Sequence, residues 1–155
     1  MINRELSRQI QRLDDLIKRT TEASAGTLEL QSHWAKYICV LSAGLLENAI
    51  TELYGEYTRR KSHGNIHSYV SSLLEGIQSA NCQKFIDVTS RFNKMWGEEL
   101  LKFVSVDGRK EALDTIIANR NRIAHGEDSG ITIVRIKEYL EKSIEVLEFV
   151  ENQCK

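Results

Sequence analysis

Apolar residues recur along most of the chain at steps of three and four, the spacing typical of amphipathic helices. The first such stripe consists of Leu6, Ile10, Leu13 and Ile17. The whole pattern predicts helices over residues 3–22, 28–62, 66–78, 82–95, 98–104, 109–124 and 133–152. The one alternating run, residues 131–134, leads straight into a helical pattern, so we expect a helix start there and no strand.

Each predicted helix is expected to bury one apolar face. In the longest helix this face comprises Leu30, Trp34, Ile38, Leu41, Leu45, Ala49, Leu53 and Tyr57. In helix 66–78 it comprises Tyr69, Val70, Leu73, Leu74 and Ile77. Gly44 and Gly55 each cost the longest helix about 1 kcal/mol relative to alanine, so we expect a close helix contact or a bend at each. Thr27, Asn81 and Thr132 are expected to cap helix N-termini with their side-chain oxygens.

Length and composition agree with a helical protein. The 155 residues suit one domain, which we expect to span 1–155. Proline, which breaks helix interiors, is absent. The predicted fold is therefore all-α, a bundle of long antiparallel helices with short helices inserted between them.

Charge and cysteine content exclude several classes of protein. The formal net charge of −1 argues against binding nucleic acid through bulk charge, although a local basic site stays open. The three cysteines form no C-x-x-C pair, and His63 and His67 have no third ligand near them, so we expect no disulfide framework and no metal site. No apolar run approaches the length of a membrane span or a signal peptide, and we expect a cytoplasmic protein without a cofactor.

Side chains suited to phosphate binding and proton transfer gather near the end of helix 109–124. They lie in the run Arg120-Asn121-Arg122-Ile123-Ala124-His125-Gly126. An arginine fork pairs with phosphate oxygens, and a histidine takes or gives a proton near neutral pH. Asn121 and His125 are four residues apart and share a helix face, and Gly126 is a typical helix terminator. Such a group suffices for metal-independent RNA cleavage, but the spacing alone is weak, with about 0.3 matches expected by chance.

With this motif the chain resembles the HEPN superfamily, whose mark is R-x4–6-H, often with a polar residue directly after the arginine. Upstream, segment 39–47 resembles the G-x-x-E helix of the branch named RiboL-PSP-HEPN, with Gly44 and Glu47 in the matching places. Further agreeing pieces are Glu56-Tyr57, Phe92, Trp96, Ala124-His125-Gly126 and Ile131-Thr132. The likeness covers about residues 30–150, and the order of several motifs makes it far more specific than R-x4-H alone.

The resemblance implies a helical bundle that dimerises and brings two R-x4-H motifs together, in many relatives an endoribonuclease of toxin–antitoxin, abortive-infection or other defence systems. It assigns Arg120 and His125 as the catalytic pair and Asn121 as their polar companion. Glu47 would orient Arg120 or His125. The implied partners are an RNA substrate, a second copy of the chain, and an antitoxin or defence protein. Some relatives carry a tyrosine two residues after the histidine that a nucleotidyltransferase modifies; Glu127 stands there, so we do not expect that regulation.

A second function stays open at this point, because other relatives have lost activity and serve as RNA-binding, nucleotide-binding or regulatory modules. The motif residues also have a structural interpretation, as a pair that caps a helix end, with Glu47 in a buried salt bridge. Arg122 is a candidate RNA contact or a solvated charge. The basic run Arg59-Arg60-Lys61 is a candidate contact for an RNA backbone or a solvated helix end.

Overall fold

The computed structural model describes residues 3–155, which contain seven α-helices and no strand. The helices are α1 (Arg4–Ala23), α2 (Leu28–Lys61), α3 (Gly64–Leu74), α4 (Cys82–Phe92), α5 (Lys94–Val104), α6 (Arg109–Ala124) and α7 (Ile133–Gln153). The all-α prediction is confirmed. None of these helices is both long enough and apolar enough to cross a membrane.

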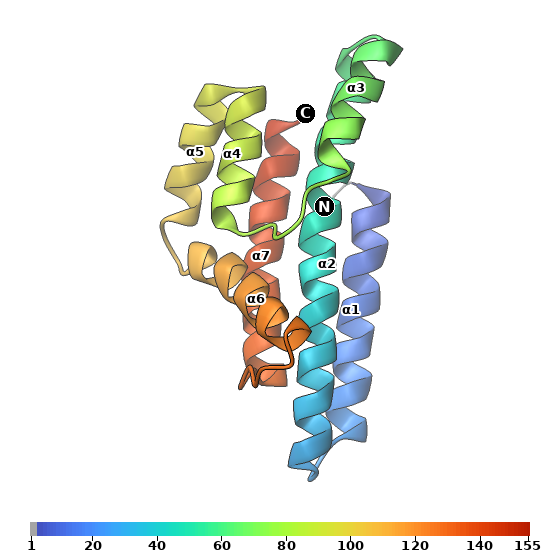
Figure 1. The fold of residues 1–155 in the computed structure, drawn as a ribbon, viewed down its shortest axis with the longest axis vertical. Coiled ribbons are helices and arrows are strands. Elements are labelled where there is room, and N and C mark those ends of the chain that lie inside the picture. The colour runs from blue at the N-terminus through green and yellow to red at the C-terminus, as the bar shows by residue number, and fades with distance from the viewer. Residues whose placement is uncertain (1–2) are drawn as a thin grey trace.

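Helix α2 is the axis of the molecule (Figure 1). Helices α1 and α7 run along it, and α3 folds back along its C-terminal part. Helices α4 and α5 pair with each other beside α7, and α6 runs obliquely from the end of α5 to α2. This course carries the C-terminal end of α6 onto the middle of α2, where the polar motifs of the two helices meet.

The bounds of α3, α4 and α5 differ from the sequence prediction. Helix α4 ends at Phe92 rather than near residue 95, and α5 begins at Lys94 with Gly97 inside it. The reason is Asn93, whose extended backbone breaks the helix and whose Oδ1 accepts the N–H groups of Met95 and Trp96. Helix α3 begins and ends earlier than predicted, at 64–74 rather than 66–78, and a non-helical connection leads to α4.

The predicted N-caps are confirmed at two of three positions. The Asn81 side chain accepts the N–H of Lys84, and the Thr132 hydroxyl accepts the N–H of Arg135. Thr27 occupies the N-cap position of α2, but its side chain makes no capping bond. A residue of the right type at the right place therefore does not guarantee the bond.

The buried face of α1 largely follows the sequence prediction, whereas those of α2 and α3 differ. Leu30 and Leu41 of α2 are exposed, and so are Tyr69 and Leu73 of α3. Helix α2 buries residues on two sides because it packs against α1, α3, α6 and α7, so a single stripe describes it poorly. Helix α3 packs mainly against α2. Because only one side of α3 is covered, Leu74 is its only fully buried residue.

Aromatic side chains join α2 to the α4–α5 pair. The ring of Tyr54 stacks on Phe92 with centroids 4.4 Å apart, and its hydroxyl hydrogen-bonds that of Thr89. Tyr57 meets Phe92 and Trp96 edge-on, at 6.1 and 5.4 Å. These contacts hold the α4–α5 pair against α2.

A close helix approach exists, but not at the glycines where the sequence predicted it. A Cβ placed on Gly44 or Gly55 would have no neighbour within 4 Å, so these positions do not serve close packing. At Gly97 an added Cβ would lie 2.9 Å from the Cβ of Ser90 and 3.0 Å from its Cα. The missing side chain at Gly97 therefore allows α5 to lie against α4.

Gly97→Ala is expected to lower the free energy of unfolding by about 1–3 kcal/mol, the usual cost of overpacking. The clash involves the Ser90 backbone, which cannot rotate away as a flexible side chain would. Gly55→Ala is the matched control, expected to gain about 0.5–1 kcal/mol. Urea unfolding of the two variants checks both values, and equal stabilities would contradict the close approach.

Candidate functional site

The C-terminal end of α6 closes in a motif that holds His125 in place. The Gly126 N–H donates to the Ile123 carbonyl at 3.1 Å, and the Glu127 N–H donates to the Arg122 carbonyl at 2.9 Å. This pair of bonds, with Gly126 in the left-handed region at φ 73°, is a Schellman motif. The His125 N–H also donates to the Asn121 carbonyl at 3.1 Å, so His125 stays on the helix face of Asn121.

Gly126→Ala is expected to cost about 1–2 kcal/mol of stability, because an L side chain disfavours the left-handed backbone. No neighbour lies within 4 Å of the added Cβ, so the cost is conformational. If His125 acts in catalysis, RNA cleavage falls as well, because the helix end moves. Gly130→Ala, also at positive φ with free space, is the control that leaves the α6 end intact. Urea unfolding and a cleavage assay separate the effects, and the same activity in both variants would contradict the role of the helix end.

Arg120, one turn before the end of α6, reaches across to α2. Its Nη2 donates to Glu47 Oε1 at 3.1 Å, forming an ion pair whose side chains are 28% and 20% exposed. Its Nη1 donates to Asn121 Oδ1 at 3.0 Å. The guanidinium is thus held from two sides and still partly open to solvent. The helices are also joined deeper in the core, where the Cys39 thiol donates to the Ile116 carbonyl at 3.5 Å and burial raises the pKa of Cys39 to about 11.

Glu47 is itself held by a group that the sequence analysis did not name. The backbone N–H of Ser79, in the connection between α3 and α4, donates to the same Oε1 at 2.8 Å. Ser79 has a φ of 54°, an uncommon value for a residue other than glycine. Because the contact uses a backbone group in an irregular segment, no residue pattern in the sequence points to it.

The structure thus brings Glu47, Arg120 and Asn121 together and places His125 one turn further along α6. The His125 side chain is exposed, and among residues 3–155 it has no hydrogen bond or ion pair. Of the two groups that Glu47 was predicted to orient, its contact is with Arg120. His125 therefore faces solvent about one helical turn along the chain from an ordered arginine.

The other predicted RNA contacts lie at two places. Arg122 is exposed on α6, with its Nε 3.8 Å from Glu127 Oε2, both side chains being mostly open to solvent. Arg59, Arg60 and Lys61 form the last turn of α2. Arg60 donates to the Cys154 carbonyl at 2.8 Å and so ties α2 to the end of α7.

The basic run of α2 is remote from the motif. It follows Glu47 by 12–14 residues along a continuous helix, a distance of about 18–21 Å at 1.5 Å per residue. Arg122 is therefore the predicted RNA contact that adjoins Arg120 and His125. The run 59–61 stays a prediction for a separate contact.

The chemistry available at the motif is anion binding combined with proton transfer. Arginine has five N–H donors, and Glu47 and Asn121 engage two nitrogens of Arg120, which leaves donors for a further oxyanion. An exposed imidazole beside such an anion can move protons to and from it. Within residues 3–155, no group of three or more His, Cys, Asp and Glu side chains is arranged to hold a metal ion.

Comparison with known proteins gives a family assignment. The family model described as RiboL-PSP-HEPN matches residues 4–155, a wider range than the sequence motifs alone covered. No curated protein and no solved structure matches the chain. HEPN domains typically bind RNA, are often ribonucleases and often dimerise, which supports an RNA-related role in general. With a match over nearly its whole length, the chain belongs to the RiboL-PSP-HEPN family of the HEPN superfamily.

Proposed function

We propose that the protein is a metal-independent endoribonuclease that cleaves RNA in a cleft formed between two copies of the chain. The observation that carries this proposal is the ordered guanidinium of Arg120, fixed by Glu47 and Asn121, with the exposed His125 at the end of the same helix. These groups bind a phosphate and move protons, which are the two tasks that RNA cleavage requires. Metal independence is proposed because the Glu47 carboxylate at the arginine is engaged with Arg120 and Ser79.

The reaction is a transesterification within the RNA. The 2′-oxygen forms a bond to phosphorus, the bond from phosphorus to the 5′-oxygen breaks, and the products end in a 2′,3′-cyclic phosphate and a 5′-hydroxyl. The proton of the 2′-hydroxyl passes to one His125 as base, and the leaving 5′-oxygen takes a proton from the other His125 as acid. Arg120 stabilises the negative charge that builds on the phosphate oxygens, and Asn121 holds Arg120 in position.

A second copy of the chain supplies the second histidine in this mechanism. Support for an interface beside the motif comes from apolar side chains left exposed on α2, namely Tyr37 (50%), Val40 (40%) and Leu41 (36%). Val40 precedes Glu47 by two turns and so shares its helix face. Apolar groups gathered next to a candidate site are typical of a contact surface.

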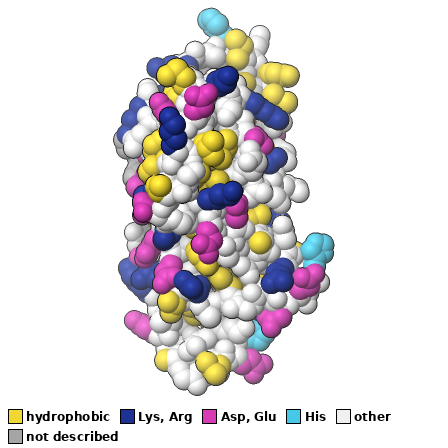
Figure 2. Space-filling model, turned by 90° about the vertical axis from the view of Figure 1, so that its left-hand side faces the viewer, with side chains coloured by type: hydrophobic (Ala, Val, Ile, Leu, Met, Phe, Trp, Pro, Cys, Tyr) yellow, Lys and Arg dark blue, Asp and Glu magenta, His cyan; other side chains and the backbone are white. Residues whose placement is uncertain are grey.

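RNA binding in this proposal depends on the local site and not on a strongly charged surface. Figure 2 shows acidic and basic side chains interspersed over the face seen there. The formal net charge of −1 agrees with this picture. Arg122 is proposed as the neighbouring RNA contact, and Arg59, Arg60 and Lys61 as a remote one. A defence or toxin–antitoxin setting, with an antitoxin or activating partner, is proposed from the family alone.

The experiment that tests the proposed function is incubation of the purified protein with total tRNA and with a structured single-stranded RNA, in EDTA. Discrete fragments that end in 2′,3′-cyclic phosphate support the nuclease and its metal independence together. Cleavage that appears only on adding Mg²⁺ contradicts the mechanism. Intact RNA under both conditions argues against a nuclease that acts alone.

A non-catalytic RNA-binding or regulatory module is the second candidate function. The observation that favours it is the His125 side chain, which within residues 3–155 of a single chain has no partner to orient it for proton transfer. Under this alternative the protein binds RNA without cutting it, and the affinity falls steeply with added salt. Fluorescence anisotropy with labelled RNA at two salt concentrations distinguishes this outcome from cleavage.

A further inference from the structure

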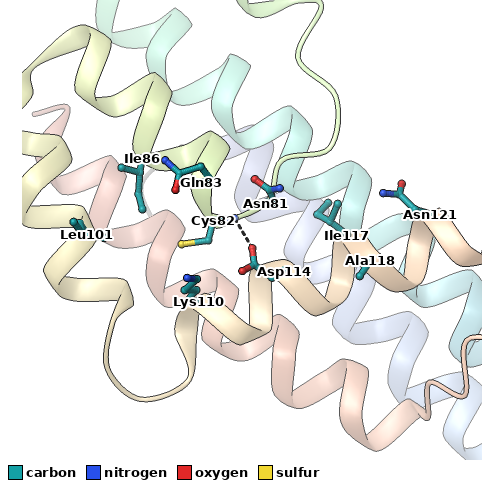
Figure 3. Close-up of a pocket in the computed structure, with 10 residues that line it drawn as sticks. All are labelled: Asn81, Cys82, Gln83, Ile86, Leu101, Lys110, Asp114, Ile117, Ala118 and Asn121. Carbon is teal, nitrogen blue, oxygen red and sulfur yellow. Dashed lines mark hydrogen bonds between the residues drawn. The ribbon is translucent and has the colours of Figure 1, made fainter.

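A cavity of about 380 Å³ lies next to the motif, between α4, α5 and α6 (Figure 3). This volume falls in the range of about 300–1,000 Å³ that small-molecule sites occupy. Asn121 lines the cavity, and the same side chain accepts the hydrogen bond from Arg120. Asn121 therefore belongs both to the cavity wall and to the hydrogen bonds that hold Arg120.

The cavity wall combines apolar and polar side chains. Ile86, Leu101 and Ile117 come from three different helices and supply apolar surface. Figure 3 shows the Asp114 carboxylate at the N-terminal end of α4, where its Oδ1 accepts the N–H of Cys82 at 2.9 Å. The polar half of the ten lining residues consists of Asn81, Gln83, Lys110, Asp114 and Asn121. The cavity therefore offers an organic ligand both apolar surface and hydrogen-bonding groups.

The charges argue against a phosphate in this cavity. A helix N-terminus binds anions through its free N–H groups, but at α4 the carboxylate of Asp114 already occupies that role. A phosphate would lie beside this carboxylate with Lys110 as the one cation among the lining residues. Burial and the nearby Asp114 raise the pKa of the Cys82 thiol to about 11, so the sulfur is a neutral part of the wall. The cavity suits an uncharged ligand.

We propose that the cavity is the subsite for the nucleobase adjoining the cleaved phosphate, and that Asp114 selects bases with an exocyclic amino group. The proposal rests on the proposed function for its substrate class, which is RNA. A carboxylate has about four lone-pair sites and the Cys82 N–H takes one of them, so Asp114 can accept a further N–H. Adenine, cytosine and guanine offer an amino group, as in carboxylate recognition of cytosine, whereas uracil offers only an N3–H flanked by two carbonyl oxygens that the carboxylate repels.

The decisive variant is Asp114→Asn. The amide oxygen can still accept the Cys82 N–H, and its NH₂ group adds a donor that suits a uracil carbonyl. We expect wild-type protein to prefer adenine or cytosine over uracil by about tenfold, and Asp114→Asn to abolish or reverse that preference. A purely structural carboxylate would change stability without changing the order of the bases.

A second variant tests the cavity by filling it. Ala118 lies on the cavity wall in α6, and Ala118→Phe places a ring where the base would enter. This change is expected to weaken binding of all bases and to reduce the differences between them. Glu111→Phe, two turns earlier on α6 and outside the cavity lining, is the matched control expected to keep the wild-type preference.

The measurement uses fluorescein-labelled DNA hexamers of deoxyadenosine, deoxycytidine or deoxyuridine, which lack the 2′-hydroxyl and cannot be cleaved by this chemistry. Fluorescence anisotropy gives their affinities for each variant, thermal melting confirms the fold, and cleavage of matching RNAs is followed in parallel. Base preference that changes with Asp114→Asn supports the subsite, even if no RNA is cut and the proposed function fails. Equal affinity for the three hexamers overturns the subsite, whether or not RNA is cleaved, and so does a preference that Asp114→Asn leaves unchanged. Absence of binding to any hexamer likewise overturns it.

Discussion

His125→Ala is expected to lower the rate of RNA cleavage on the order of 10⁴-fold, at the upper end of what one acid–base group contributes. The effect is large because, in the proposed dimer, one substitution removes both the base and the acid. Arg120→Ala is expected to cost about 10²–10³-fold, as for the loss of one group that stabilises an oxyanion. Initial rates on a labelled RNA in EDTA, with urea unfolding of each variant, provide the measurement.

Matched controls come from the same chain. His33 is an exposed histidine 3.8 Å from Glu29, and Arg135 is an exposed arginine 3.0 Å from Glu138. Their alanine variants remove the same types of side chain at positions outside the motif and are expected to keep wild-type rates. Cleavage at the wild-type rate in His125→Ala or in Arg120→Ala would refute the mechanism.

If the cleft forms between two copies of the chain, mixing wild-type and variant subunits tests the mechanism further. If each active dimer needs two intact copies of His125, adding His125→Ala protein to wild type produces mixed dimers of low activity. The specific activity of the wild-type chains then falls as the variant is added in excess. Activity that stays proportional to the wild-type protein would show that each chain works on its own.

Glu47→Gln is expected to lower kcat by up to about a hundredfold while changing KM little, because a reacting group displaced by about 1 Å loses about 10² in rate. The substituted amide keeps an oxygen for Ser79 and Arg120 but loses the charge that fixes the guanidinium. Glu47→Ala also leaves the Ser79 N–H without its acceptor, which adds about 1–3 kcal/mol of destabilisation. Steady-state kinetics and urea unfolding on both variants separate positioning from stability.

Glu52→Gln, five residues further along α2, is the control for loss of a carboxylate on the same helix. We expect it to leave kcat unchanged. If Glu47→Gln and Glu52→Gln behave alike, Glu47 serves the fold and does not position Arg120. Glu47 also serves only the fold if Glu47→Gln keeps its activity while Glu47→Ala loses activity in proportion to its loss of folding stability.

The amino-acid sequence predicts more of this fold than of its surface. Periodicity locates seven helices, because burying one apolar face is a local demand that shows in the spacing of residues. It fails at the turn between α4 and α5, where Asn93 caps the second helix and a search for N-cap residues would have found it. It also fails at Leu41 and Tyr69, because whether an apolar residue is covered depends on which distant helix packs there.

Some residues of the candidate site can likewise be predicted from the sequence, and others cannot. The motif and the family resemblance point to Arg120, Asn121 and Glu47, and the structure places these side chains in hydrogen-bond contact. Ser79 escapes prediction because it contributes a backbone N–H from an irregular connection. Asp114 escapes it because a carboxylate near the start of a helix has an ordinary structural explanation, and only the adjoining cavity sets it apart.

The Ser79 amide and Arg120 share one oxygen of Glu47, so exchange at this amide is sensitive to the position of Arg120. Because Arg120 and the Ser79 N–H meet at one atom, an event that draws the guanidinium away alters the hydrogen bond of an amide in another segment. Hydrogen exchange at this single amide follows the opening of that bond. Mass spectrometry or NMR of this exchange can therefore show when a phosphate binds Arg120, with unlabelled RNA and no probe attached to the site.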